Sequence, residues 1–173
     1  RWGAHRTRLN GVQAKNSFPY SKNDDHMIGY LWGLKTEALF DVWSIEHLLS
    51  GLSVGNIVMS LHLHLYTRYF GLERSKIRTS YFDVISVLFL AYLWETAEHY
   101  METGLVGTVV ADWFQGVEFW ANRMIADPLA SVLGYYTAQR FPPLVNVARG
   151  LSLVWLVVHI FVFPHSMYLH TLF

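Results

Sequence analysis

The sequence has no cysteine and a small share of charged residues. Without cysteine, the chain cannot form disulfides, zinc–thiolate sites, iron–sulfur clusters or a thiol nucleophile. Asp, Glu, Lys and Arg make up 15% of the residues, whereas an ordinary soluble domain has about 25%, and this argues against a soluble enzyme. Thirteen basic residues balance thirteen acidic residues, so no excess of positive charge points to nucleic acid as a partner.

The sequence is rich in hydrophobic residues. They make up 53% of the 173 residues, and aromatic residues make up 16%, a composition that excludes a disordered chain. Residues 47–67 and 150–173 contain no Asp, Glu, Lys or Arg, and each reaches the roughly 20 residues that a membrane-spanning helix needs. Two further apolar segments carry some charge. The sequence therefore predicts an all-α integral membrane bundle of four transmembrane helices, with approximate spans 42–67, 81–101, 113–138 and 149–172.

The first forty residues differ from the rest of the chain. Residues 1–27 contain Arg, Lys, Asn and Gly without periodicity, which predicts an extended polar arm. Residues 28–40 read IGYLWGLKTEALF, a short amphipathic and aromatic stretch that suits an interfacial helix or a membrane-entry segment. We expect residues 28–173 to form a single membrane domain.

Acidic residues are concentrated within or beside the predicted spans. A charge at the bilayer centre costs about 2.5–3.5 kcal/mol on insertion scales, so these groups have to face the bundle interior, lie near an interface, take up protons or bind something positive. Only one basic residue, Arg123, lies deep among them. The eight acids are Asp41, Glu46, Glu95, Glu98, Glu102, Asp112, Glu118 and Asp127.

Helical spacing brings several of these polar residues to common faces. The second predicted span carries polar residues at i, i+3, i+4 and i+7, which share one face of a helix: Glu95, Glu98, His99 and Glu102. The third carries Gln115, Glu118 and Asn122 at the same spacing. Asp127 is followed by Pro128, the pattern of a helix N-cap with proline at the first helical position. The third span is therefore predicted to break at Asp127.

This polar centre has three interpretations. It binds a lipid headgroup, a proton or a cation without covalent chemistry, it is a catalytic metal site, or it is a hydrogen-bonded network that locks the helices together. The predicted ligand-binding residues are His47, Glu95, His99, Glu118, Asn122, Arg123 and Asp127. A metal-dependent membrane oxidoreductase with iron or copper would use Glu95, Glu98, His99 and Glu118. The third interpretation suits a small accessory subunit of a respiratory, photosynthetic or oxidase complex, and no catalytic residue is predicted.

Two weaker signals lie in the apolar helices. Gly51 and Gly55 form a small-x-x-x-small pattern, which predicts close packing of the first span against another helix. His47 and His159 lie in different predicted helices and could ligate haem or a chlorophyll-type pigment. Membrane lipid is the predicted ligand, ahead of iron, copper, haem or a chlorophyll-type pigment.

The order of polar residues forms three short motifs between residues 40 and 138. The first span opens with Asp41-x5-His47-x3-Gly51. The second ends with Trp94-Glu95-x2-Glu98, and the third contains Arg123-x3-Asp127-x6-Gly134. This arrangement resembles VanZ-like membrane proteins and YjdF-like bacterial inner-membrane proteins.

The resemblance implies a small protein of the bacterial cytoplasmic membrane without established enzymology. One type of VanZ-like protein is linked to glycopeptide resistance, which implies a role near lipid intermediates of the cell envelope. The chain departs from the family pattern because Val42 follows Asp41 where a lysine is usual. The glutamine that often follows the glutamate of the second helix is also missing, and the N-terminal arm has no counterpart.

Overall fold

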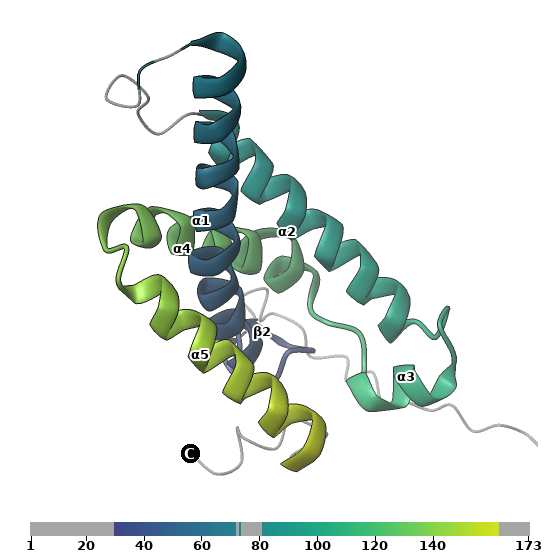
Figure 1. Cartoon of the computed structure of the whole chain (residues 1–173). Coiled ribbons are helices and arrows are strands. Elements are labelled where there is room, and N and C mark those ends of the chain that lie inside the picture. Colours follow the sequence, from purple (N-terminus) through teal and green to yellow (C-terminus); the bar gives the residue numbers. More distant parts are fainter. Residues whose placement is uncertain (1–29, 72, 74–80, 163–173) are drawn as a thin grey trace, which may run out of the picture.

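The computed structural model describes residues 30–71, 73 and 81–162. The predicted arm over 1–27 and the end of the predicted fourth span therefore lie outside the described residues. The described chain is mostly helical, as predicted (Figure 1). In chain order, the elements are β1 (Tyr30–Trp32), β2 (Ala38–Phe40), α1 (Val42–Phe70), α2 (Tyr81–Glu102), α3 (Thr108–Phe114), the π-helical turn η2 (Asn122–Ala126), α4 (Asp127–Arg140), α5 (Leu144–Val157) and the π-helical turn η3 (Val158–Val162).

The four predicted spans correspond to helices of very different character. Among the described residues, α1 is the one helix that is long and apolar enough to cross a membrane. Helix α2 coincides with the second predicted span, but four buried acidic residues interrupt its apolar sequence. The third span is divided between α3, η2 and α4. The fourth begins five residues earlier than predicted, at Leu144, directly after Pro143.

The predicted helix break at Asp127 is wrong. Asp127 has right-handed helical backbone angles (φ −73°, ψ −42°), and the chain runs without interruption from η2 into α4. The break lies at Gln115 and Gly116, whose φ angles of 55° and 121° cannot continue a right-handed helix. Pro128 does lie in the first turn of α4, where its missing N–H fits the preceding π-helical turn. The N-cap residue of α4 is Ala126, and the Asp127 side chain is buried without a hydrogen-bond partner among the described residues.

The predicted interfacial helix over 28–40 is wrong for the described residues 30–40. These form β1 and β2, which pair in parallel, and the Gly33 N–H donates to the carbonyl of Phe40 over 3.2 Å. Aromatic residues at the strand positions favour an extended backbone. The turn between the strands also directs Lys35 inward to Glu102, which a helix lying on the membrane surface would not do.

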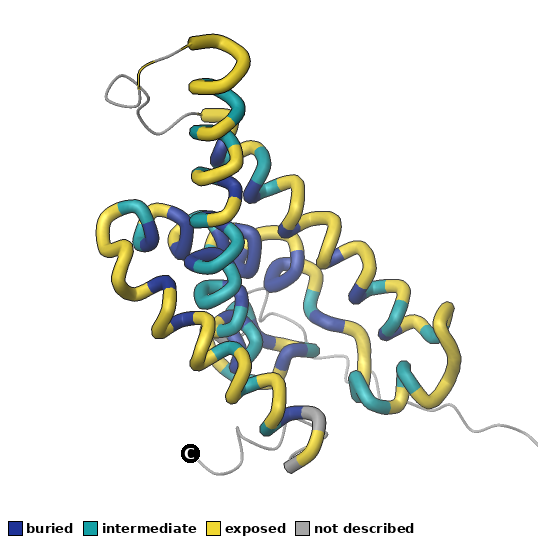
Figure 2. The backbone as a smooth tube through the Cα atoms, in the orientation of Figure 1, coloured by how far each residue is buried: buried dark blue, intermediate teal, exposed yellow. Residues whose placement is uncertain are grey.

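Helices α1 and α4 cross in close contact at the centre of the fold (Figure 1). A Cβ atom added to Gly51 would lie 2.2 Å from the Ser131 carbonyl oxygen, and one added to Gly134 would lie 2.3 Å from the Leu48 oxygen. The close packing predicted from Gly51 and Gly55 is thus confirmed, and α4 contributes a third glycine. Figure 2 shows that buried residues gather at this crossing, while the outward turns of α2 and α5 are exposed.

Candidate functional site

The site begins at the N-terminus of α1. The Asp41 carboxylate accepts hydrogen bonds from the N–H groups of Trp43 (2.7 Å) and Ser44 (3.0 Å), and the Ser44 hydroxyl accepts one from the Asp41 N–H. This capping box fixes where α1 starts. His47 follows within the next two turns and is buried.

Helix α2 supplies three glutamates on its inner face. Glu95, Glu98 and Glu102 are all buried, as their i, i+3 and i+7 spacing predicts. His99 occupies the edge of the same face and is partly exposed. Burial of three carboxyl groups on one helix requires compensating charge or hydrogen bonds from its neighbours.

Glu102 is fully compensated by residues from three other segments. Its two oxygens are paired with Lys35 and with Arg123, whose Nη2 lies 2.5 Å from Oε2. The backbone N–H of Glu118 donates to the same Oε2 over 3.1 Å. Because the Phe119 N–H also donates to the Lys35 carbonyl, the strand segment and the link before η2 are tied together at this glutamate.

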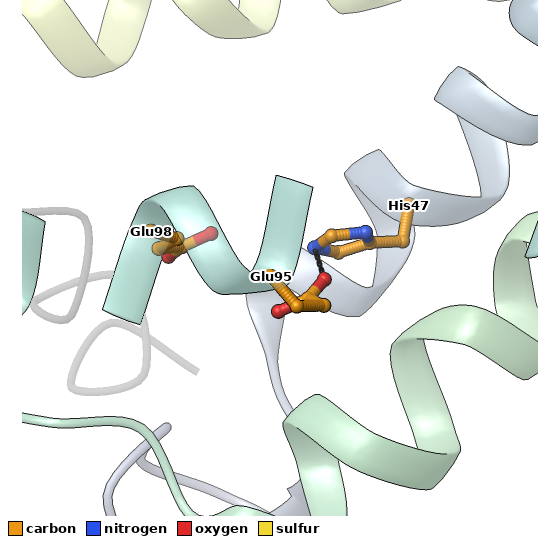
Figure 3. A group of neighbouring side chains, drawn as sticks. All are labelled: His47, Glu95 and Glu98. Carbon is orange, nitrogen blue, oxygen red and sulfur yellow. Dashed lines mark ion pairs between the residues drawn. The ribbon is translucent and has the colours of Figure 1, made fainter. Parts of the chain in front are cut away.

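Glu95 is in the opposite situation. It is 1% exposed, and neither of its carboxylate oxygens has a hydrogen-bond partner among the described residues. His47 Nε2 lies 3.4 Å from Glu95 Oε1 and 3.3 Å from Asp127 Oδ2. Figure 3 shows the imidazole of α1 directed at Glu95, with Glu98 one turn further along α2. Helices α1, α2 and α4 therefore bring one imidazole and several carboxylates to a common point.

Two overlapping sets of side chains have the separations of metal ligands. One ligand atom each from His47, Glu95 and Glu98 lies within 4.8 Å of the others, and the same holds for Glu95, Glu118 and Asp127. Glu95 belongs to both sets. An ion placed among these atoms would complete contacts that Glu95 otherwise lacks.

The charges in this region do not balance. Six buried carboxyl groups face two buried basic side chains, Lys35 and Arg123. Like charges this close cannot all stay ionised in a dry interior. The excess negative charge has to be neutralised by protons or by a bound cation. The six carboxyl groups are Asp41, Glu95, Glu98, Glu102, Glu118 and Asp127.

The structure brings the seven predicted ligand residues into one region, but they play different parts there. His99 lies beside Arg123, with Nδ1 3.1 Å from Nη1, and is absent from both metal-ligand sets. The predicted metal set is thus altered, since His47 takes the place of His99 and Asp127 is added. Asn122 is fully buried and accepts a 3.4 Å hydrogen bond from Ser44.

The two histidines considered for haem or pigment are used differently. His159 lies between the rings of Trp43 and Trp155, 4.7 Å from each, and its Nδ1 is 2.8 Å from the Trp155 carbonyl oxygen. His47 faces carboxylates. The two imidazoles thus have different neighbours, and their role as ligands of haem or a pigment stays a prediction.

Two functional neighbours, Lys35 and Glu102, were absent from the predicted site. The signal for Glu102 was present, since it completes the i, i+3, i+7 face of α2. Lys35 gave only a weak signal, as the lone cation in an aromatic stretch. Its partner Glu102 lies 67 residues away in the chain, so no local pattern connects the two.

No protein-family model, curated protein or solved structure matches the chain. The resemblance to VanZ-like and YjdF-like proteins stays a prediction.

Proposed function

We propose that the chain is an integral membrane protein whose buried acidic cluster binds a divalent metal ion without covalent chemistry. The observation that carries this proposal is the pair of Glu95 oxygens, which are buried without a hydrogen-bond partner and lie beside His47. Burial of a carboxylate without hydrogen bonds is strongly unfavourable. A cation at this point would be coordinated by the Glu95 oxygens and would compensate for their missing hydrogen bonds.

The donor atoms favour a first-row transition metal. Imidazole nitrogen suits zinc, iron and copper, and carboxylate oxygen suits manganese and magnesium. The set of His47, Glu95 and Glu98 combines one imidazole with two carboxylates and is suited to Mn²⁺, Fe²⁺ or Zn²⁺. The guanidinium of Arg123 lies 3.2 Å from Glu118 Oε2 and 3.8 Å from Glu95 Oε2. It would orient these carboxylates rather than replace the metal.

The membrane location is supported by α1 and by the outer surface. Large apolar side chains are exposed along the outward faces of α2, α4 and α5, and contiguous apolar surface of this kind is typical of contact with lipid. Leu93, Leu133 and Leu153 are each more than half exposed. In the proposed arrangement all four predicted spans lie in a bacterial cytoplasmic membrane, and the acids of α2 face inward.

The test is metal content and metal affinity of the purified protein. Wild-type protein in mild detergent should carry at least one transition-metal ion per chain by inductively coupled plasma mass spectrometry. Glu95→Gln should lower the affinity for added Mn²⁺ by about 100-fold, since it removes a ligand shared by both sets. Asp83→Asn, which changes another buried acid of α2, should leave the metal affinity unchanged.

A protonated cluster is the competing outcome. In that case neither the wild-type protein nor Glu95→Gln would bind metal after reloading. This result would contradict the metal proposal and favour protons as the neutralising charge.

A further inference from the structure

We propose that the pocket between α1, α2 and α5 binds an amphiphilic cation, a protonated amine on a hydrocarbon chain, with the ammonium group on Glu46. This binding site goes beyond the proposed metal function, because Glu46 belongs to neither metal-ligand set. The inference starts from a cavity of about 600 Å³, a volume typical of small-molecule sites.

The charge of the lining favours a cation. Glu46 of α1 is the one acidic residue among the described residues that line the pocket, and these include no lysine or arginine. Glu46 Oε1 accepts a 3.5 Å hydrogen bond from the Ser50 hydroxyl, whereas Oε2 is buried with no hydrogen-bond partner in the described part of the chain. An ammonium group would satisfy this oxygen with a charge-assisted hydrogen bond, and an anionic group would be repelled.

A second polar atom in the lining also lacks a partner. The Ser152 hydroxyl of α5 is buried and makes no hydrogen bond to any described residue. Buried polar groups are normally hydrogen-bonded, so unsatisfied oxygens on two helices around one cavity indicate a ligand with a polar end. Both oxygens accept hydrogen bonds, and a primary ammonium group carries three N–H donors.

Tryptophan side chains surround the same end of the pocket. Trp43 precedes Glu46 by three residues, so the two share a face of α1. Trp155 lies near Trp43, because the ring of His159 is 4.7 Å from both. Trp94 of α2 completes the three tryptophans of the lining. Indole is the aromatic ring that attracts cations most strongly, so these side chains suit an ammonium group.

The rest of the pocket is apolar and matches a hydrocarbon chain. Val54 of α1 and Val87 of α2 line it, and Val54 lies about 12 Å along α1 from Glu46 at the helical rise per residue. A chain of medium length would bury its methylene groups over this distance. Leu153 and Leu156 of α5 also line the pocket and are 63% and 52% exposed, so the chain can enter from the outer apolar surface.

The experiment compares three ligands with the same chain length and different polar ends, namely decylamine, decanol and decanoate. Decylamine is a cation at neutral pH, as the lysine side chain is. Competition with radiolabelled decylamine for the purified protein in maltoside detergent gives the three affinities. The wild-type protein should bind decylamine at least tenfold more tightly than decanol and should bind decanoate most weakly.

A charge-removing variant tests the ammonium contact. Glu46→Gln should weaken decylamine binding at least tenfold and leave decanol binding unchanged, because it removes the charge and keeps the shape of the side chain. Glu37→Gln, at an exposed position, is the matched control and should bind all three ligands as the wild type does. Unchanged melting temperatures would show that both variants are folded.

Pocket-filling variants test the position of the chain. Ala91 lines the pocket and is 8% exposed, so Ala91→Trp should weaken decylamine and decanol binding alike. Leu156→Trp should do the same from α5, where the larger side chain is easier to accommodate. Leu133→Trp is the matched control because Leu133 is exposed on α4 and is not a lining residue, and it should weaken neither ligand.

Unchanged decylamine affinity in folded Glu46→Gln would overturn the ammonium contact. Tighter binding of decanoate or decanol than of decylamine would overturn the choice of a cation. Wild-type affinity in folded Ala91→Trp and Leu156→Trp would show that the ligand does not occupy this pocket. None of these measurements depends on metal content, so this inference and the proposed metal function can fail separately.

Discussion

Helices α1, α2 and α4 form two buried polar groups of the same design. In the first, His62 of α1 and Tyr135 of α4 both contact Asp83 of α2, at 2.5 Å and 3.0 Å. In the second, His47 of α1 lies between Glu95 of α2 and Asp127 of α4. The arrangement of helices is shared, and the difference lies in the residue that α4 supplies.

A tyrosine and an aspartate have opposite consequences at that position. The Tyr135 hydroxyl donates a hydrogen bond, so both oxygens of Asp83 are satisfied. Asp127 offers a second acceptor in place of a donor, and Glu95 is left without a hydrogen-bond partner. The first group is therefore a structural contact between helices, whereas the carboxylates of the second have to be neutralised by a proton or a cation. Asp83 and Glu95 are both buried, so burial alone does not distinguish the two groups; their hydrogen-bond partners do.

The largest effect on stability is expected at Arg123, which lies beside the second group. Arg123→Ala would leave Glu102 and Glu118 without their guanidinium partner, and breaking a buried ion pair costs about 3–5 kcal/mol. Thermal unfolding in detergent measures this loss. Arg140→Ala, at an exposed cation of α4, should change stability by less than about 0.5 kcal/mol. A stable, fully metal-loaded Arg123→Ala protein would contradict the proposed centre.

The next largest effect on stability is expected from a change at the contact between α1 and α4, which both polar groups share. Gly51→Ala places a methyl group 2.2 Å from the Ser131 carbonyl oxygen, and the overpacking should cost about 1–3 kcal/mol. It should also lower metal affinity, since α1 must move away from α4. Gly150→Ala has open space around it and should stabilise α5 by roughly 0.5–1 kcal/mol. Equal melting temperatures for the two variants would show that α1 and α4 are not in close contact.

Asp83→Asn tests the first polar group, in which both carboxylate oxygens of Asp83 have a hydrogen-bond partner. It keeps the shape but loses the charge-assisted contact with His62, and the expected destabilisation is about 1–3 kcal/mol. Chemical or thermal unfolding, with metal content measured in parallel, should show lower stability at constant metal binding. Asp112→Asn, at an exposed position of α3, is the control. Loss of metal in Asp83→Asn would mean that the two groups are not independent.

The smallest effect on stability, and the sharpest contrast, is expected for Asp127→Asn. The amide can donate a hydrogen bond toward Glu95, as Tyr135 does for Asp83. In the presence of a chelator, the variant should therefore be as stable as the parent or more stable by about 1 kcal/mol, although it binds metal poorly. A clear destabilisation in metal-free buffer would instead assign Asp127 a structural role.

Local patterns in the sequence were sufficient for α1 and α2. Apolar length predicted both helices, and the helical period placed Glu95, Glu98 and Glu102 on one buried face. Glycine spacing predicted the close approach at Gly51. These features depend on neighbours within two turns of the same helix, so they can be recognised without knowing the fold.

Local patterns failed where the chain depends on distant partners. Residues 30–40 form strands around a buried Lys35 because Glu102 receives its ammonium group. The third span is interrupted at Gln115 and Gly116 rather than at Asp127, since the link between α3 and η2 has to reach Lys35 and Glu102. In each case, a contact across many residues outweighs the local preference of the segment.

The sequence by itself determined that this protein is helical and apolar, and that acids outnumber cations within its apolar segments. The tertiary structure decided which acids are satisfied. Glu102 receives Lys35 and Arg123, while Glu95 meets His47 and another carboxylate. The physical reason is that charge compensation depends on distances of a few ångströms between side chains from different helices, and these distances exist only after the helices have packed.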